Sequence, residues 1–183
     1  MKTVIIIGAS HAAPDAISTL RRAGWDGKII LIGDEAHLPY QRPPLSKAYY
    51  SDEVNRDKLE IRNAAFYEKN DVQLKLGQRV TSIDRTGQTV MLENGDALEY
   101  DKLILATGTR ARQLKVPGAD LPQISYLRTL DDVDAIKQKL QNKSSSEQPA
   151  KLLIIGAGYI LSCLLYTSPS PRDLSTSRMP SSA

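Results

Sequence analysis

A short segment near the start of the chain has the residue types and spacing to hold a diphosphate. It reads Gly8-Ala9-Ser10-His11-Ala12-Ala13. Turns of the form Gly-x-Gly-x-x-Gly let the backbone approach a pyrophosphate and present it to a helix N-terminus, which carries N–H groups and partial positive charge. Serine and alanine stand here at the second and third glycine positions. Alanine still permits close helix–strand packing, and the serine hydroxyl can donate to a phosphate. An ordinary glycine-containing strand–helix turn is the alternative.

An acidic residue follows at the distance that a nucleotide ribose requires. Asp34 lies 26 residues after Gly8, and Glu35 stands beside it. A carboxylate at this place can accept hydrogen bonds from both hydroxyls of an adenosine ribose. It also disfavours a 2′-phosphate, which favours FAD or NAD over NADP. A solvated loop acid is the alternative reading of Asp34.

The elements that would position these residues form a βαβ unit. Residues 3–7 and 28–32 are continuous apolar, β-branched runs, which are typical of parallel strands buried on both faces. Residues 11–23 predict a helix between them, with Pro14 in the first turn, where its missing N–H costs little. The sequence therefore predicts an α/β fold whose first turn carries the Gly8 segment.

The rest of the chain changes pattern and then returns to it. Residues 35–60 predict an irregular loop, and residues 63–69 predict a short helix. Short alternating stretches predict an antiparallel segment that begins at Val72, with stretches at 72–75, 78–84 and 89–93 and turns at 86–87 and 94–95. The remaining predicted elements are a buried strand at 102–106, a helix at 130–142 and a strand at 151–155. No convincing helix is predicted after the last of them.

The segment from Leu38 to Lys47, Leu-Pro-Tyr-Gln-Arg-Pro-Pro-Leu-Ser-Lys, is the most specific feature. It resembles the flavin-contacting segment of ferredoxin reductase-type enzymes, in the pyridine nucleotide-disulfide oxidoreductase superfamily. The resemblance implies that the two prolines hold a rigid backbone along the isoalloxazine and that Arg42 neutralises the FAD pyrophosphate. It also implies that Lys47 stabilises the negative charge of reduced flavin, as the catalytic residue. A proline-rich surface loop with solvated charges is the alternative.

Three more positions match the same family in order and spacing. Val80 resembles the residue whose backbone pairs with the adenine, and Ala106-Thr107-Gly108 resembles the strand-ending motif that closes over the flavin. Arg128 resembles an arginine that lies near the FAD. The resemblance implies a Rossmann-like FAD-binding domain with a parallel sheet and an antiparallel β excursion.

A second glycine turn resembles the start of the family's NAD-binding motif, Gly-x-Gly-x-x-Gly-x-Glu. Gly156 and Gly158 match its first two glycines, whereas Leu161 and Cys163 replace the third glycine and the glutamate. We therefore expect the chain to be truncated as a second Rossmann unit begins. The predicted domains are an FAD-binding domain at 1–142, a linker at 143–150, the first strand and glycine turn of an NAD-binding domain at 151–161, and a tail at 162–183.

The tail has a different composition from the rest of the chain. Residues 162–183 contain seven serines and three prolines, a composition typical of disorder. Two blocks, 163–173 and 177–183, resemble the translation of a transposase-type sequencing adapter. We therefore expect an artefactual tail from about residue 162, and a natural flexible C-terminus is the alternative.

The resemblance implies an NAD(P)H-dependent ferredoxin reductase as the parent protein. Such an enzyme moves hydride from NADH to FAD and passes electrons to a small iron–sulfur protein, a ferredoxin or rubredoxin. The fragment itself is expected to be inactive, since the family's flavin domain resumes after the NAD-binding domain. The alternatives are the flavin domain of a nitrite reductase, a flavin-binding module like apoptosis-inducing factor, and a non-functional truncated product. Disulfide reductases and NADH oxidases of this plan need cysteines early in the chain, whereas the only cysteine is Cys163.

Composition disfavours several other classes of protein. The net charge is +3 with scattered basic residues, which predicts neither nucleic-acid binding nor attachment to a membrane surface. No apolar run approaches the roughly 20 residues that span a bilayer. A single cysteine offers no disulfide framework, so a reducing, cytoplasmic location is expected. No set of metal ligands is predicted.

Overall fold

The computed structural model describes residues 2–144, 152–156, 158–160 and 163–164. The chain divides into two compact units. The first combines Met1–Gln41 with Arg56–Arg110, and the second combines Arg42–Asn55 with Ala111–Ala183.

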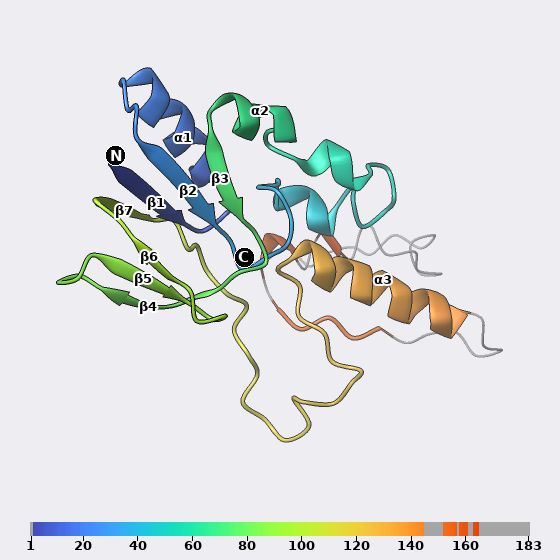
Figure 1. Cartoon of the computed structure of the whole chain (residues 1–183). Coiled ribbons are helices and arrows are strands. Elements are labelled where there is room, and N and C mark those ends of the chain that lie inside the picture. The colour runs from blue at the N-terminus through green and yellow to red at the C-terminus, as the bar shows by residue number, and fades with distance from the viewer. Residues whose placement is uncertain (1, 145–151, 157, 161–162, 165–183) are drawn as a thin grey trace, which may run out of the picture. The chain divides into compact units, whose positions relative to one another are not determined.

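The first unit is built on a parallel sheet of four strands in the order β3-β2-β1-β7 (Figure 1). The strands are β1 (Thr3–Ile7), β2 (Lys28–Ile32), β3 (Val72–Lys75) and β7 (Lys102–Leu105). Ile5 of β1 lies opposite Ile30 of β2 and Leu103 of β7. The predicted strands at 3–7, 28–32 and 102–106 are therefore confirmed, because continuous apolar runs suit strands that are covered on both faces.

The prediction that an antiparallel segment begins at Val72 is wrong. Strand β3 pairs in parallel with β2, so that Ile30 lies opposite Gln73. Apolar and polar residues alternate in β3 because it is an edge strand with only one face packed, and this alternation led to the wrong prediction. Val72 and Leu74 pack against the buried cluster under the helices, while Gln73 is exposed.

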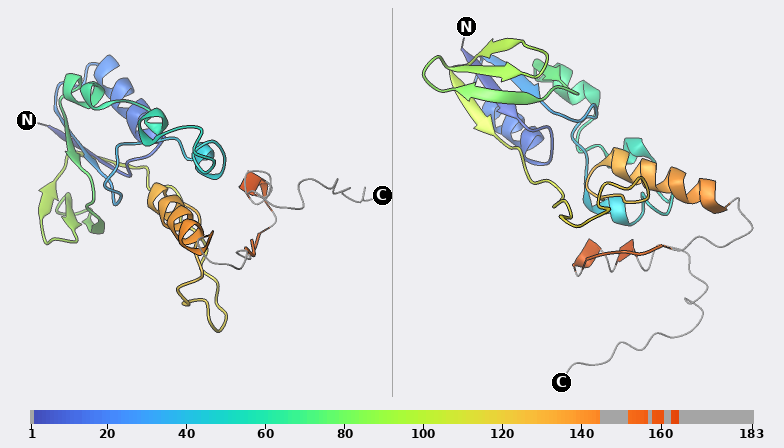
Figure 2. Two further views of the ribbon diagram at one scale, coloured as in Figure 1. Left: turned by 90° about the vertical axis from the view of Figure 1, so that its right-hand side faces the viewer. Right: turned by 90° about the horizontal axis from the view of Figure 1, so that it is seen from below.

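Two layers cover the parallel sheet on opposite faces (Figure 2). The helices α1 (Ala12–Arg22) and α2 (Ala64–Lys69) cover one face, where Ala13, Ile17 and Tyr67 pack with Val4 and Ile6. An antiparallel sheet covers the other, with its strands in the order β4 (Val80–Asp84), β5 (Thr89–Leu92) and β6 (Ala97–Glu99). Successive residues of β1 thus pack into the cores on opposite faces of the sheet, as the two-residue period of a strand requires. The predicted turns at 86–87 and 94–95 join these three strands.

Tyr67 of α2 places a hydroxyl in the helix-side core without a hydrogen-bond partner among the described residues. Burial raises the pKa of Tyr67 above its ordinary value, Glu60 raises it further, and Arg62 opposes the shift. The unfolded tyrosine ionises near pH 10 while the folded one stays neutral, so stability falls as the pH rises above about 10.

We expect Tyr67→Phe to remove this loss of folding stability at alkaline pH. At neutral pH the variant should unfold at the same urea concentration as the wild type or higher, because the lost hydroxyl had no partner. Urea titrations between about pH 8 and 11 measure the difference in unfolding free energy between the variant and the wild type. Above pH 10 the slope of this difference should approach about 1.4 kcal/mol per pH unit. Parallel pH curves for the two proteins would contradict the prediction.

The second unit contains the short 3-10 helix η1 (Pro43–Ser46) and the long helix α3 (Leu130–Ser144). Thr129 and Asp132 cap α3 reciprocally. The Asp132 carboxylate accepts from the Thr129 N–H at 2.7 Å, and the Asp132 N–H donates to the Thr129 hydroxyl at 3.1 Å. The predicted helix at 130–142 is confirmed and runs two residues further, to Ser144.

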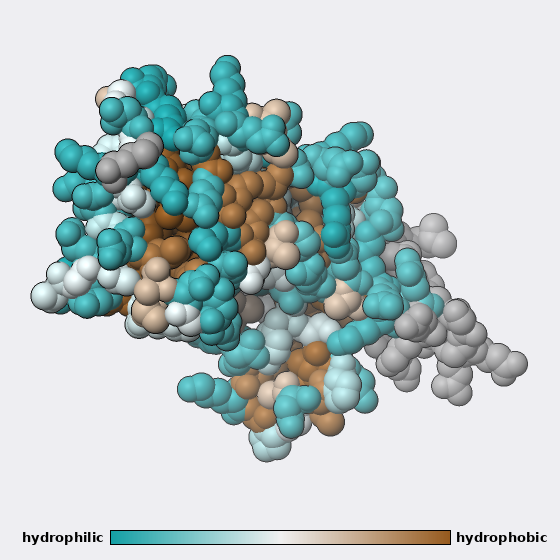
Figure 3. Space-filling view, in the orientation of Figure 1, coloured by the Kyte–Doolittle hydropathy of each residue, from teal (hydrophilic) through white to brown (hydrophobic). Residues whose placement is uncertain are grey.

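The predicted loop at 35–60 holds η1 and a second 3-10 helix, η2 (Arg56–Leu59), which belongs to the first unit. In the second unit, a long loop before α3 exposes Leu114, Val116 and Leu121. Brown apolar residues also show on the surface in Figure 3. Lys139 of α3 ties this loop by donating to the Pro122 carbonyl at 2.8 Å.

The segment before the second glycine turn differs from its prediction. Residues 152–156 form no strand, and Leu153 is 83% exposed, so the apolar run has no sheet to enter within the described residues. Residues 159–160 and 163–164 have helical backbone, and the residues between and after them lie outside the described part of the chain, so the expectation that no helix follows the turn stays a prediction. The tail beyond residue 164 lies outside the described residues. No described helix is both long and apolar enough to cross a bilayer.

Candidate dinucleotide site

The carboxyl ends of the four parallel strands gather the predicted residues of the first unit at one edge. The Gly8 turn follows β1, Asp34 follows β2, and Ala106-Thr107-Gly108 follows β7. From β1 the chain passes to β2 and β3 on one side, and it returns to β7 on the other side of β1. Ligands of open α/β sheets bind outside the carboxyl ends at such a switch in strand order.

Gly8 lies against the backbone that follows β7. Its φ is +115°, and a Cβ built there would lie 2.1 Å from the Ala106 carbonyl oxygen. The Ala106 N–H donates to the Ile7 carbonyl at 2.7 Å, and the Gly8 N–H donates to Ile32 at 2.8 Å. From the sequence, glycine is expected at position 8 because a phosphate must approach the backbone there. The structure adds a second requirement, the approach of β7.

The N-terminus of α1 lies at the same edge. His11 stands at the N-cap position and makes no side-chain capping hydrogen bond, and the Ser10 hydroxyl lies 3.5 Å from its Nδ1. His11 and Ala12 are exposed, whereas Ala13 is fully buried in the core beneath α1. Alanine at the third glycine position thus lets α1 pack closely on the sheet, as expected from the motif.

The two acids after β2 have different surroundings. Glu35 accepts a short hydrogen bond from the Tyr40 hydroxyl, so it helps to fix the loop that follows. Asp34 is exposed, and its Oδ2 lies 3.5 Å from the Arg79 guanidinium. Sequence reasoning missed Arg79. The only signal for it was its position next to Val80, one of the predicted binding residues.

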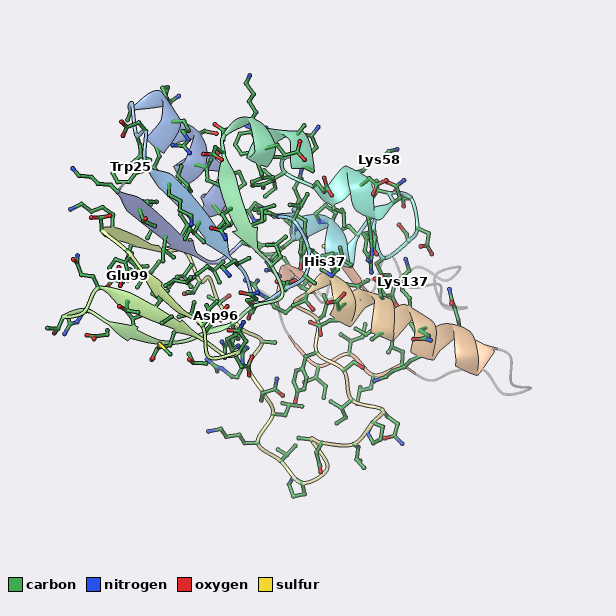
Figure 4. The ribbon with its side chains drawn as sticks, in the orientation of Figure 1. Trp25, His37, Lys58, Asp96, Glu99 and Lys137 are labelled. Carbon is green, nitrogen blue, oxygen red and sulfur yellow. The ribbon has the colours of Figure 1, made fainter. Side chains whose placement is uncertain are left out.

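A pocket of about 240 Å³ lies beside this ion pair. Its lining consists of Gly77, Gln78, Arg79, Glu93 and Asn94. The Gln78 side-chain oxygen is buried and has no hydrogen-bond partner among the described residues. The pocket therefore joins the carboxyl end of β3 to the β5–β6 turn, near the labelled Asp96 in Figure 4.

In the second unit the structure brings two predicted residues into contact. Arg42 donates from Nη1 to the Arg128 carbonyl at 3.0 Å, although 86 positions separate them. Pro43 and Pro44 open η1, where fixed φ angles and missing N–H groups suit a helix start. Lys47 follows η1 with an exposed side chain.

Other residues have plainer surroundings. Trp25 packs against the core beneath α1, near the amino ends of the strands and away from the Gly8 turn (Figure 4). Gly156 and Gly158 are exposed. Within the described residues, no group of three or more histidine, cysteine, aspartate or glutamate side chains could hold a metal ion.

Residues 2–161 match the family described as pyridine nucleotide-disulphide oxidoreductase. The chain is 44% identical over 158 residues to rhodocoxin reductase of Rhodococcus erythropolis, covering 86% of this chain and 36% of that protein. It is 35% identical over 157 residues to rubredoxin-NAD(+) reductase of Pseudomonas putida, covering 86% of this chain and 39% of that protein.

The fold matches solved structures of the same kind. A ferredoxin reductase from Rhodopseudomonas palustris superimposes with a TM-score of 0.72 at 45% identity, covering 78% of this chain and 35% of that chain. The chain therefore spans little more than a third of the length of these relatives.

Proposed function

Because the chain belongs to the pyridine nucleotide-disulphide oxidoreductase family, we propose that it binds FAD as part of an NAD(P)H-dependent ferredoxin reductase. The Gly8 turn at the switch point of the sheet carries this proposal. A Cβ at Gly8 would clash with the Ala106 backbone after β7, and the N-terminus of α1 follows the turn directly. This arrangement suits a diphosphate, which needs close backbone approach and unshielded N–H groups.

The other residues fit the same cofactor. Asp34 offers an exposed carboxylate to the ribose hydroxyls, and the Arg79 guanidinium lies 3.5 Å from that carboxylate. For Arg42 and Lys47 of the second unit, we propose the roles that the family resemblance implies, with Arg42 supplying positive charge to the diphosphate and Lys47 supplying it to the flavin. FAD, when bound, provides the redox chemistry by accepting hydride and passing on single electrons.

The electron donor and acceptor follow from the relatives. Rhodocoxin reductase and rubredoxin-NAD(+) reductase are named for small electron carriers, and the second is also named for NAD(+). We propose NADH as the donor and a small iron–sulfur protein or rubredoxin as the acceptor of the complete enzyme. A cytoplasmic location fits this proposal, because NADH is supplied there.

Titration of the purified chain with FAD tests the proposal. We expect quenching of FAD fluorescence and a shifted visible spectrum, with saturation at one FAD per chain. Asp34→Ala should weaken FAD binding about tenfold, because a hydrogen bond to a charged group contributes about 1.5 kcal/mol. Asp26→Ala, which removes an exposed acid before β2, is the matched control and should bind FAD as the wild type does. A chain that stays colourless at saturating FAD would contradict the proposal.

A further inference from the structure

Lys47 lies in a compact run of turns rather than in a regular element. Its N–H donates to the Pro44 carbonyl at 2.9 Å, and its own carbonyl accepts from the Ser51 N–H at 3.0 Å. The Ser51 hydroxyl also donates to this carbonyl, at 3.2 Å. These hydrogen bonds all lie within the segment, so they fix its local backbone but do not hold the segment against the rest of the second unit. Contacts with α3 supply that restraint.

Tyr49, two residues after Lys47, is the point of attachment. Its side chain is buried, and its hydroxyl donates to Asp134 Oδ1 at 2.7 Å. Its carbonyl accepts from Lys137 Nζ at 2.9 Å, and the same Nζ lies 4.8 Å from its ring centroid. Figure 4 labels Lys137 on α3. One tyrosine is thus held at its hydroxyl, ring and carbonyl.

Asp134 and Lys137 can contact the same tyrosine because of their spacing on α3. Asp134 and Lys137 are three positions apart, so they lie on one face of the helix, one turn from each other. Lys137 also pairs with Asp52, which has a φ of 62°, a left-handed conformation that is strained for a residue other than glycine. The ion pair helps to hold the turn that carries this strain.

The segment is also attached on the other side of Lys47. Arg42 donates to the Arg128 carbonyl, and the Arg128 N–H donates to Asp132, which caps α3. Ser46, immediately before Lys47, is buried. Arg128, just before α3, therefore holds the segment five positions before the lysine, and α3 itself holds it two positions after the lysine.

We infer that Tyr49 is a positioning residue, which places the Lys47 ammonium through its contacts with Asp134 and Lys137 of α3. This inference rests on the proposed function, in which Lys47 faces the flavin. The influence of an ammonium on a flavin falls with distance, and four rotatable bonds separate the ammonium from the backbone. A backbone that shifts would therefore weaken the electrostatic effect of Lys47 even though the side chain is intact.

Tyr49→Phe in the full chain tests the inference, because it removes the hydroxyl contact and leaves the charge unchanged. The first measurement needs no cofactor and follows tryptic cleavage after Lys47 by mass spectrometry, relative to cleavage after Lys75 in β3. We expect cleavage after Lys47 to become about fivefold faster, as befits the loss of one hydrogen bond that opposes local opening. Cleavage after Lys75 should stay unchanged. Tyr50→Phe, at the adjacent buried tyrosine, is the control and should change neither rate.

The second measurement is the midpoint potential of the FAD-bound chain. Lys47→Met should lower the potential, since it removes a positive charge that favours reduced flavin. Tyr49→Phe should lower it in the same direction, and the double variant should match Lys47→Met alone, because both changes act through one ammonium. Purely structural damage would not produce this non-additivity.

The outcomes separate the inference from the proposed function. Unchanged cleavage after Lys47 in Tyr49→Phe would overturn the inference, and so would additive shifts of the potential. If FAD binds but Lys47→Met leaves the potential unchanged, the inference fails while FAD binding stands. If the wild-type chain binds no FAD, the proposed function fails, and the rate of cleavage after Lys47 alone decides the attachment of the segment to α3.

Discussion

Gly8→Val is expected to abolish FAD binding and to destabilise the first unit by about 3 kcal/mol or more. The added Cβ would lie 2.1 Å from the Ala106 carbonyl oxygen and 2.4 Å from its carbon, so the backbone after β1 or after β7 must move. The φ of +115° adds strain, because residues with a Cβ rarely adopt it. Urea unfolding followed by circular dichroism measures the stability, and FAD fluorescence quenching measures the binding.

Gly24→Ala is the matched control for backbone strain. Gly24 has a φ of +82°, and nothing lies within 4 Å of the position of its missing Cβ. It follows α1, at the far end of the helix from the Gly8 turn. The variant should therefore lose about 1 kcal/mol from strain alone and keep wild-type affinity for FAD. Wild-type affinity in Gly8→Val would show that this turn does not approach the cofactor.

The first βαβ unit could be predicted because its signals are local. Apolar runs, a proline in the first helical turn and an acid at the right distance need no knowledge of distant residues. The strands predicted at 3–7 and 28–32 accordingly became β1 and β2, and the helix predicted at 11–23 became α1, which is one residue shorter at each end. Strand β3 could not be assigned in this way, because its alternating pattern reports which faces are covered and not the direction of its partner.

The missed residues all act across long distances in the sequence. Arg79, immediately before β4, pairs with Asp34, which follows β2, and Tyr49 contacts Asp134 across 85 positions. Their types are ordinary for exposed turns and tyrosine-rich loops, so only the folded chain distinguishes them. Lys47 was found because a family resemblance carried it, whereas the tyrosine that holds its segment had no motif of its own.

Ile17→Ala is expected to cost about 2–5 kcal/mol, a large share of the roughly 5–15 kcal/mol that stabilises a domain. Ile17 is fully buried and shares the core with Val4, Ile6 and Leu31, so its truncation leaves a cavity beneath α1. Urea unfolding at neutral pH measures the loss. Thr19→Ala, on the exposed side of the same helix, is the control and should change stability by at most about 0.5 kcal/mol.

Ile17→Ala also separates two effects, the loss of packing beneath α1 and the loss of FAD binding at the N-terminus of α1. Ile17 lies in the core and has no part in the proposed FAD site, so any loss of affinity should reflect the smaller folded fraction. Excess FAD at 100 times its dissociation constant should then restore about 2.7 kcal/mol by mass action. Gly8→Val should gain nothing from the same excess, because its defect lies where the diphosphate is proposed to bind. Equal rescue of both variants would place the Gly8 turn outside the FAD site.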